Sequence, residues 1–246
     1  MMYQPYEIEG AERPARFLVT CDHAANTVPD FVNGGGLGLA AADMARHIAY
    51  DIGAAGLARA LARALECPAI LTDFSRLVID PNRGEDDPTL VMKLYDGTVI
   101  PANRHVDADD LARRLNRLYR PYHSALAELA ARREDTVIVS VHSFTRQLRG
   151  RPPRPWHIGL LYAADTRLAL PLLARLRQEP DLCIGENQPY GGHLPSDAIA
   201  RHGIAYERPN VLIEMRNDLI ETPQAQAAWA ARLAPILQEV ADRAGV

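Results

Sequence analysis

The segment RFLVTCDHAAN, residues 16–26, joins an apolar run to a group of polar side chains. The run FLVTC has the length and the aromatic and β-branched content of a strand that is buried between helices. Asp22, His23 and Asn26 follow it directly. Ligands of open α/β sheets bind at the carboxyl ends of the strands, so polar residues in this position are candidates for a functional site. The segment therefore predicts a buried strand with chemically active groups at its end.

Two later segments have the same organisation. The apolar run TVIVSV ends at His142-Ser143, and the run NVLI ends at Glu214 and continues through Met215 to Arg216. If these runs are neighbouring strands, their polar ends meet at one edge of a sheet. The three segments together would then bring two imidazoles and a carboxylate to one place.

Short apolar runs alternate along the chain with alanine-, leucine- and arginine-rich stretches of helical period, a pattern typical of an α/β fold. The expected strands are Arg16–Asp22, Pro68–Thr72, Leu77–Asp80, Thr136–His142, His157–Ala163 and Asn210–Met215. The expected helices are Ala40–Leu65, Asp107–Arg133, Thr166–Gln178 and Thr222–Ala244. No segment has the composition of a linker, so we expect a single domain over residues 1–246.

The charge of the chain argues against several kinds of partner and mechanism. It has 27 basic and 31 acidic residues, for a net charge of -4, which gives no electrostatic reason to expect a nucleic-acid partner. Lys93 is the only lysine, and its surroundings do not form a phosphate-binding loop. Most arginines, including Arg113, Arg114 and Arg117, are expected on the solvated surface.

The chain has no sign of a membrane segment or of a disulfide framework. No apolar run approaches the roughly 18 to 20 residues that a bilayer requires, and the first residues contain no signal-peptide core, so we expect a cytoplasmic protein. Cys21, Cys67 and Cys183 are odd in number and lack CxxC spacing. They are therefore expected to be buried free thiols.

The polar residues at the strand ends favour a metal site. Imidazole is the commonest metal-ligating side chain, and catalytic zinc usually has three protein ligands. His23 and His142 are two candidates, while the third is Asn26 or Asp22, between which the residues alone do not decide. Glu214 would be costly to bury as an ion without a partner, so we interpret it as a base beside the metal or as the partner of an arginine such as Arg216.

The segment SRLVIDPNR, residues 75–83, combines strand-like alternation with a turn and two arginines. Arginine presents a planar fork that matches a carboxylate, and an asparagine can hold one of the same oxygens. Asn82 and Arg83 therefore form a candidate binding site for the carboxylate of a small acidic molecule.

Seven short motifs in this order resemble those of the N-formylglutamate amidohydrolase family. They are DHAANTVP (22–29), SRLVIDPNR (75–83), RPYH (120–123), VHSFT (141–145), RPWHIGLLY (154–162), GENQPY (185–190) and IEMRND (213–218). That family is similar in turn to the zinc carboxypeptidases and to the aspartoacylase and succinylglutamate desuccinylase group. The resemblance implies a three-layer α/β/α fold around a central mixed sheet.

The resemblance also implies roles for individual residues. His23 and His142 match the first and last zinc ligands of the relatives, and Asn26 stands where the relatives have glutamate, with Asp22 as the alternative. In the relatives an asparagine and an arginine bind the substrate carboxylate, a preceding arginine polarises the scissile carbonyl, and a glutamate is the general base. These positions correspond here, in that order, to Asn82, Arg83, Arg76 and Glu214.

The implied activity is metal-dependent hydrolysis of a small N-acyl amino acid, N-formyl-L-glutamate or a similar acidic amide, with one divalent ion, expected to be zinc, as cofactor. Tyr190 and Arg216 are further candidate substrate contacts, and His193 and His202 flank a loop that could cover the pocket. Two alternatives stay open. One is a binding protein for an acidic metabolite without tight metal binding, and the other is metal-free hydrolysis by Ser143. The sequence does not indicate the acyl group or the oligomeric state.

Overall fold

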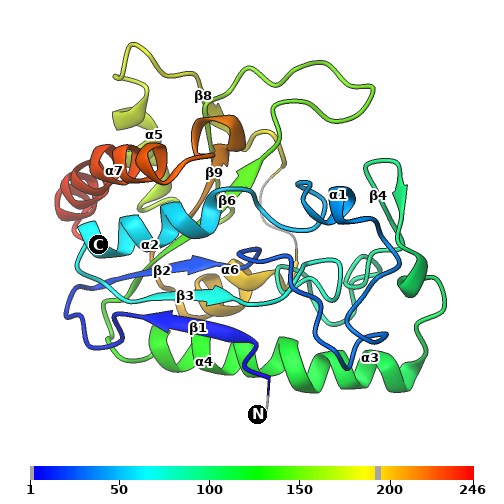
Figure 1. The fold of residues 1–246 in the computed structure, drawn as a ribbon. Coiled ribbons are helices and arrows are strands. Elements are labelled where there is room, and N and C mark those ends of the chain that lie inside the picture. Colours follow the sequence, from blue (N-terminus) through cyan, green and yellow to red (C-terminus); the bar gives the residue numbers. More distant parts are fainter. Residues whose placement is uncertain (1–2, 192–194) are drawn as a thin grey trace.

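A seven-stranded mixed sheet forms the centre of the computed structural model, which describes residues 3–191 and 195–246 (Figure 1). Its strands are β1 (Tyr6–Glu9), β2 (Phe17–Cys21), β3 (Ala69–Thr72), β6 (Val137–Phe144), β7 (Ile158–Leu161), β8 (Ile184–Glu186) and β9 (Asn210–Arg216). They lie in the order β1-β3-β2-β6-β9-β7-β8, and β4 (Leu94–Tyr95) and β5 (Thr98–Val99) form a separate hairpin. The predicted α/β class is confirmed.

The four strands in the middle of the sheet run parallel. β2 pairs in parallel with β3 and β6, and β6 pairs in parallel with β9, whereas β1 and β7 are antiparallel to their neighbours β3 and β9. The carboxyl ends of β2, β6 and β9 therefore meet at one edge, as expected. In the β6–β9 register His142 lies opposite Glu214, so both side chains point to the same face of the sheet.

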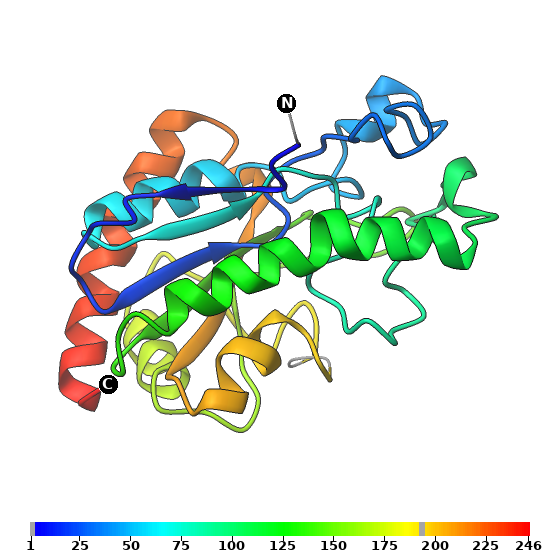
Figure 2. The ribbon, with the colours of Figure 1, turned by 90° about the horizontal axis from the view of Figure 1, so that it is seen from below.

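Helices cover both faces of the sheet (Figures 1 and 2). The helices are α1 (Ala41–Met44), α2 (Ala54–Ala64), α3 (Ala108–Arg114), α4 (Arg120–Ala130), α5 (Ala169–Leu176), α6 (Ala198–His202) and α7 (Pro223–Ala244). On one face α2, α5 and α7 pack against Val19 of β2 and Val139 of β6. On the other face α4 and α6 pack against Leu18 and Ile138, the alternate residues of the same two strands. The three-layer α/β/α arrangement is thus confirmed.

The predicted helix 40–65 is wrong in its middle. The chain leaves the helical path after α1 and resumes it at α2, and Gly53 between them has φ 80°. A Cβ at Gly53 would lie 2.2 Å from the carbonyl oxygen of Ile220, so only glycine fits this left-handed turn without displacement. The interruption leaves Asp51 in a turn, where its side chain can face the sheet edge.

The predicted strand 77–80 is also wrong. These residues form a buried turn, in which Val78 N donates to Ser75 O and Asp80 N donates to Leu90 O. Their apolar side chains fill a third cluster beside the sheet instead of pairing with a strand, so the alternation reflects burial without a ladder. Arg114, expected on the surface, supports this turn, because its buried guanidinium donates to Val78 O at 2.8 Å.

The predicted helix 107–133 is essentially continuous. α3 passes through a π-helical turn η2 (Leu115–Tyr119) into α4. Strands β1 and β8 of the sheet were not predicted from the sequence, and neither was helix α6. The thiols of Cys21 and Cys67 are buried as expected, whereas Cys183 is exposed. Among the described residues, no helix combines the length and the apolar character needed to cross a membrane.

The turn before α2 gives a stability test. We expect Gly53→Ala to lower the free energy of unfolding by about 1–3 kcal/mol, because alanine must adopt a left-handed φ against the Ile220 carbonyl. Urea unfolding followed by circular dichroism measures this. Gly36→Ala is the control, since Gly36 has no atom within 4 Å of its Cβ position. Equal stability of the two variants would contradict the role of Gly53.

Candidate active site

A pocket of about 460 Å³ lies at the sheet edge where β2, β6 and β9 end. The site candidates of the sequence that line it are His23, Arg76, Asn82, Arg83, His142, Tyr190 and Glu214, and Asp51 joins them. The pocket therefore brings together most of the residues expected to act.

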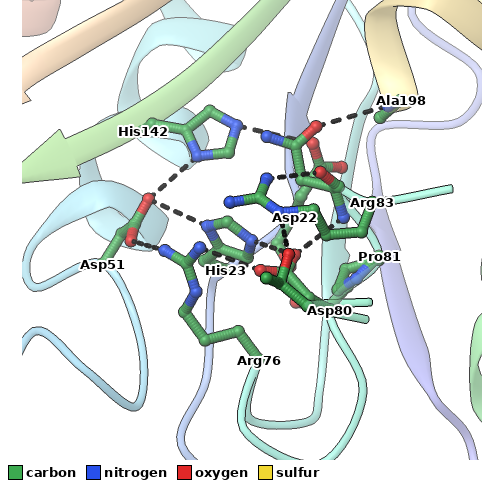
Figure 3. Close-up of polar contacts among 12 residues, drawn as sticks. Asp22, His23, Asp51, Arg76, Asp80, Pro81, Arg83, His142 and Ala198 are labelled. Atoms are coloured by element: carbon green, nitrogen blue, oxygen red, sulfur yellow. Dashed lines mark hydrogen bonds and ion pairs between the residues drawn. The ribbon is translucent and has the colours of Figure 1, made fainter. Parts of the chain in front are cut away.

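Two imidazoles and one carboxylate form a buried group in this pocket (Figure 3). His23 follows β2, His142 belongs to β6, and Asp51 comes from the turn before α2. Asp51 Oδ2 lies 3.3 Å from Nδ1 of His23 and 2.9 Å from Nδ1 of His142. Each residue offers one ligand atom within 4.8 Å of the others, so the group could hold a metal ion.

A carboxylate also lies on the far side of each imidazole. His23 Nε2 is 2.7 Å from Oδ1 of Asp80, and His142 Nε2 is 3.4 Å from Oδ2 of Asp22 and 3.1 Å from Ser140 Oγ. Carboxylates in this position orient metal-ligating histidines and fix which ring nitrogen faces the metal. Both Nδ1 atoms thus face Asp51, and the donor set fits a divalent ion such as zinc.

The charge balance of the group is consistent with this fit. Burial alone would lower the pKa of His142, but the hydrogen bonds with Asp22 and Asp51 outweigh it and raise this pKa to about 10. Burial alone would raise the pKa of Asp51, but the contacts with His23 and His142 outweigh this effect, so the net shift is downward. Positive charge on the two imidazoles thus stabilises the Asp51 carboxylate. A bound divalent cation could supply this positive charge in their place.

Arg76 is the counterion of Asp80 and Asp51, the two carboxylates that contact His23. Its guanidinium is buried, lies 2.8 Å from Oδ2 of Asp80 and 3.5 Å from Oδ1 of Asp51, and lines the pocket. Burial would raise the pKa of Asp80, but Arg76 holds this pKa well below its ordinary value. Arg76 therefore stays charged beside the candidate metal group.

Glu214 is a carboxylate of this pocket that forms no ion pair with another described residue. It is buried, and its Oε2 atom has no hydrogen-bond partner among the described residues. Burial raises the pKa of Glu214 to about 7. Gly159 lies opposite it on β7, where a Cβ would come within 1.9 Å of the Gln188 carbonyl oxygen, so glycine lets the pocket wall pack closely beside Glu214. A carboxyl group that changes protonation near neutral pH is suited to proton transfer.

Asn82 and Arg83 form the opposite wall. Asn82 N donates to Oδ1 of Asp80 at 2.9 Å, and Arg83 donates to Thr89 Oγ1 and to Asn82 O. Within the described part of the chain no carboxylate pairs with Arg83, so its positive charge faces the pocket. Tyr190 stands at the rim, 37% exposed, with its hydroxyl 3.3 Å from the Arg154 guanidinium.

Several predicted residues lie elsewhere. Asn26 is exposed and donates to the carbonyl oxygen of Met44, so the structure does not bring it to the two histidines. Arg216 pairs with Asp218 at 2.7 Å and does not line the pocket. Ser143 does line the pocket, but its hydroxyl donates to Ile52 O at 2.8 Å and not to a histidine. His193 lies outside the described residues.

Asp51 was not among the predicted site residues, because the helical period continues through it. The available signal was the short sequence Asp51-Ile52-Gly53, since glycine inside a helical pattern weakens the expectation of a helix. Asp22, the alternative third ligand, lies behind His142 and accepts a hydrogen bond from Tyr122 at 2.5 Å.

The fold and the pocket define an α/β protein with a candidate metal site at the carboxyl ends of its parallel strands. The chain belongs to the N-formylglutamate amidohydrolase family, whose sequence pattern matches residues 15–221. This confirms the resemblance noted above, and the chain is accordingly an amidohydrolase, a hydrolase of amide bonds.

Two solved structures share the fold of this chain. A gene product of Agrobacterium tumefaciens is 32% identical with a TM-score of 0.92, over 100% of this chain and 98% of that chain. The N-formylglutamate amidohydrolase of Ralstonia eutropha JMP134 is 23% identical with a TM-score of 0.74, over 98% and 99% of the two chains, a likeness of fold. No curated protein matches the sequence significantly.

The buried ion pairs of Arg76 give a second stability test. Arg76→Met should lower the free energy of unfolding by about 3 kcal/mol, because it leaves Asp80 and Asp51 buried without their guanidinium. Arg113→Met removes an exposed pair with Asp110 and should cost at most about 0.5 kcal/mol. Denaturant titration of both variants checks the difference. If both variants lost a similar amount of unfolding free energy, the ion pairs of Arg76 would not be what stabilises the buried Asp80 and Asp51.

Proposed function

We propose that the protein hydrolyses the amide bond of a small acidic N-acyl amino acid, with N-formyl-L-glutamate as the preferred substrate. The observation that carries this proposal is one pocket that combines a His-Asp-His group with a buried glutamate and an arginine, neither of which forms an ion pair with another described residue. The family supports amide hydrolysis, and the unpaired arginine supports an acidic substrate.

In this proposal His23, Asp51 and His142 hold a divalent ion, with zinc as the preferred metal. Two neutral imidazole nitrogens and one carboxylate oxygen are a ligand set that catalytic zinc uses. Asp51 takes the position expected for Asn26 or Asp22. The ion supplies Lewis-acid activation of water and of the amide carbonyl at neutral pH.

Glu214 acts as the general base and then as the general acid. With a pKa near 7 it can accept a proton from the attacking water and return it to the leaving nitrogen, which an amide requires because an amide anion leaves poorly. Its position opposite His142 on β9 places it beside the metal group. The proposed base thus lies on β9, next to the metal ligand His142 on the neighbouring strand β6.

Arg76 and Arg83 have the remaining roles in this proposal. Arg76, held by Asp80 and Asp51, polarises the scissile carbonyl and stabilises the oxyanion that forms on attack. Asn82 and Arg83 bind the substrate carboxylate, and Tyr190, which lines the pocket at its rim, contacts the bound molecule. Arg216, which pairs with Asp218 outside the pocket, has no role in this scheme.

The third ligand can be tested directly. Asp51→Asn should weaken zinc binding by about 100-fold or more, because it removes the anionic ligand, whereas Asn26→Ala should bind zinc as the wild type does. Zinc titration against a chelating dye measures both affinities without any activity assay. If Asn26→Ala lost zinc and Asp51→Asn kept it, the assignment would be reversed.

A substrate panel tests the function. N-formyl, N-acetyl and N-succinyl amino acids would be assayed with and without added Zn²⁺, and we expect the highest kcat/KM for N-formyl-L-glutamate with zinc.

Glu214→Gln should lower turnover by about 10²- to 10⁴-fold at unchanged zinc content, because the amide cannot transfer the proton. A Glu214→Gln enzyme with wild-type turnover would refute the base. A chain that binds these compounds and hydrolyses none would be a binding protein.

A further inference from the structure

The backbone that carries Asn82 and Arg83 is held from behind by two side chains of one helix. Tyr119, at the end of the π-helical turn η2, donates its hydroxyl to Arg83 O at 2.5 Å. His123, one turn further along in α4, lies 3.0 Å through Nε2 from Pro81 O. Residues four apart share one face of a helix, so both contacts reach the same turn of the chain from one side.

Each of these side chains is in turn held by α6. Arg201 donates to the Tyr119 hydroxyl at 2.9 Å, and His202 Nε2 lies 2.9 Å from His123 Nδ1 with the two rings stacked. A carbonyl oxygen only accepts, so His123 Nε2 carries the hydrogen that it donates to Pro81. In the neutral ring Nδ1 is then an acceptor, and His202 donates to it.

Both imidazoles are neutral in this arrangement. Burial lowers the pKa of His123 to about 3 and that of His202 to about 4. The two chains of hydrogen bonds therefore run in one direction, from His202 through His123 to Pro81 O and from Arg201 through Tyr119 to Arg83 O.

A third contact joins α6 to the same turn. The backbone N–H of Ala198, the first residue of α6, donates to Oδ1 of Asn82 at 3.3 Å (Figure 3). Asn82 has one carboxamide oxygen, and this contact uses it. Its NH₂ group is therefore directed by α6 and left available for a ligand oxygen.

We propose that α6 is a positioning element for substrate binding, which acts through His202–His123 and Arg201–Tyr119 to hold Asn82 and Arg83 in the geometry that receives the substrate carboxylate. This inference rests on the carboxylate-binding role proposed above for Asn82 and Arg83. The pocket lining does not include His123, His202, Tyr119 or Arg201. They fix the backbone from which the binding groups project, and displacement of such groups by about 1 Å can reduce their effect by about 100-fold.

The test compares Tyr119→Phe, His202→Leu and His202→Gln by the KM and kcat of the metal-loaded enzyme for N-formyl-L-glutamate. Tyr119→Phe keeps the ring and removes one hydroxyl, and His202→Leu keeps the volume and removes the donor. Each should raise KM about tenfold, as expected for the loss of one hydrogen bond, with kcat within about threefold of wild type. His202→Gln retains an N–H donor at a similar distance and should return KM to within about threefold.

Tyr206→Phe is the matched control, because Tyr206 follows α6 and is 61% exposed. It should leave both constants unchanged. Zinc content and thermal midpoint are measured for every variant, and Tyr119→Phe keeps the test valid if His202→Leu does not fold. A fall in kcat at constant KM, or equal KM values for Tyr119→Phe and wild type, would overturn the positioning role.

Arg83→Ala separates this inference from the function on which it rests. If Arg83→Ala raises KM and Tyr119→Phe does not, only the positioning role fails. If Arg83→Ala leaves KM unchanged, the carboxylate site itself is wrong. When both raise KM, the double variant Arg83→Ala/Tyr119→Phe should raise it less than the product of the single effects, because Tyr119 acts largely through Arg83. Multiplicative effects would count against this connection.

Discussion

The burial of charge at the sheet edge is the constraint on which the rest of this structure depends. Asp51 is buried with Oδ2 against both His23 and His142, and its other oxygen faces Arg76. A buried ion costs several kcal/mol unless partners compensate it, so each of these groups is tolerated because the others are present. The strand β6, the turn after β2, the turn before α2 and the segment 75–83 must therefore reach their positions together. The geometry of the candidate site and the folded state therefore depend on the same set of contacts.

The parts of the fold that the sequence predicted are those set by local pattern. The strands near residues 17–21, 137–144 and 210–216 are buried on both faces and appear as continuous apolar runs. Their polar ends identified His23, His142 and Glu214, because the parallel arrangement brings such ends together. β1 and β8 were not predicted, since one is a half-exposed four-residue edge strand and the other has three residues.

Other residues depend on contacts between distant parts of the chain. Asp51 enters the pocket because Gly53 turns the backbone beside Ile220, a contact across more than 160 positions that no local pattern records. Asn26 has the expected spacing from His23, yet the segment after β2 directs it to the Met44 carbonyl. Arg114 has the helical spacing of a surface residue, but the buried turn at Val78 needs its guanidinium. The position of each of these three side chains is therefore determined by a contact with a distant segment, which the residue's own type and spacing do not reveal.

The pairing of His142 with Glu214 in the sheet has a consequence for how this site can change in evolution. Adjacent strands lie about 4.8 Å apart, and the ladder between β6 and β9 sets which residues face each other. The separation of the two Cα atoms is therefore set by main-chain hydrogen bonds, which do not depend on the surrounding side chains. Mutational drift in the surrounding helices can alter thermal tolerance while the spacing of the pair persists. The pocket wall at residues 80–83, to which we assign carboxylate binding, is not part of a strand ladder, so we expect divergence in substrate preference to accumulate there first.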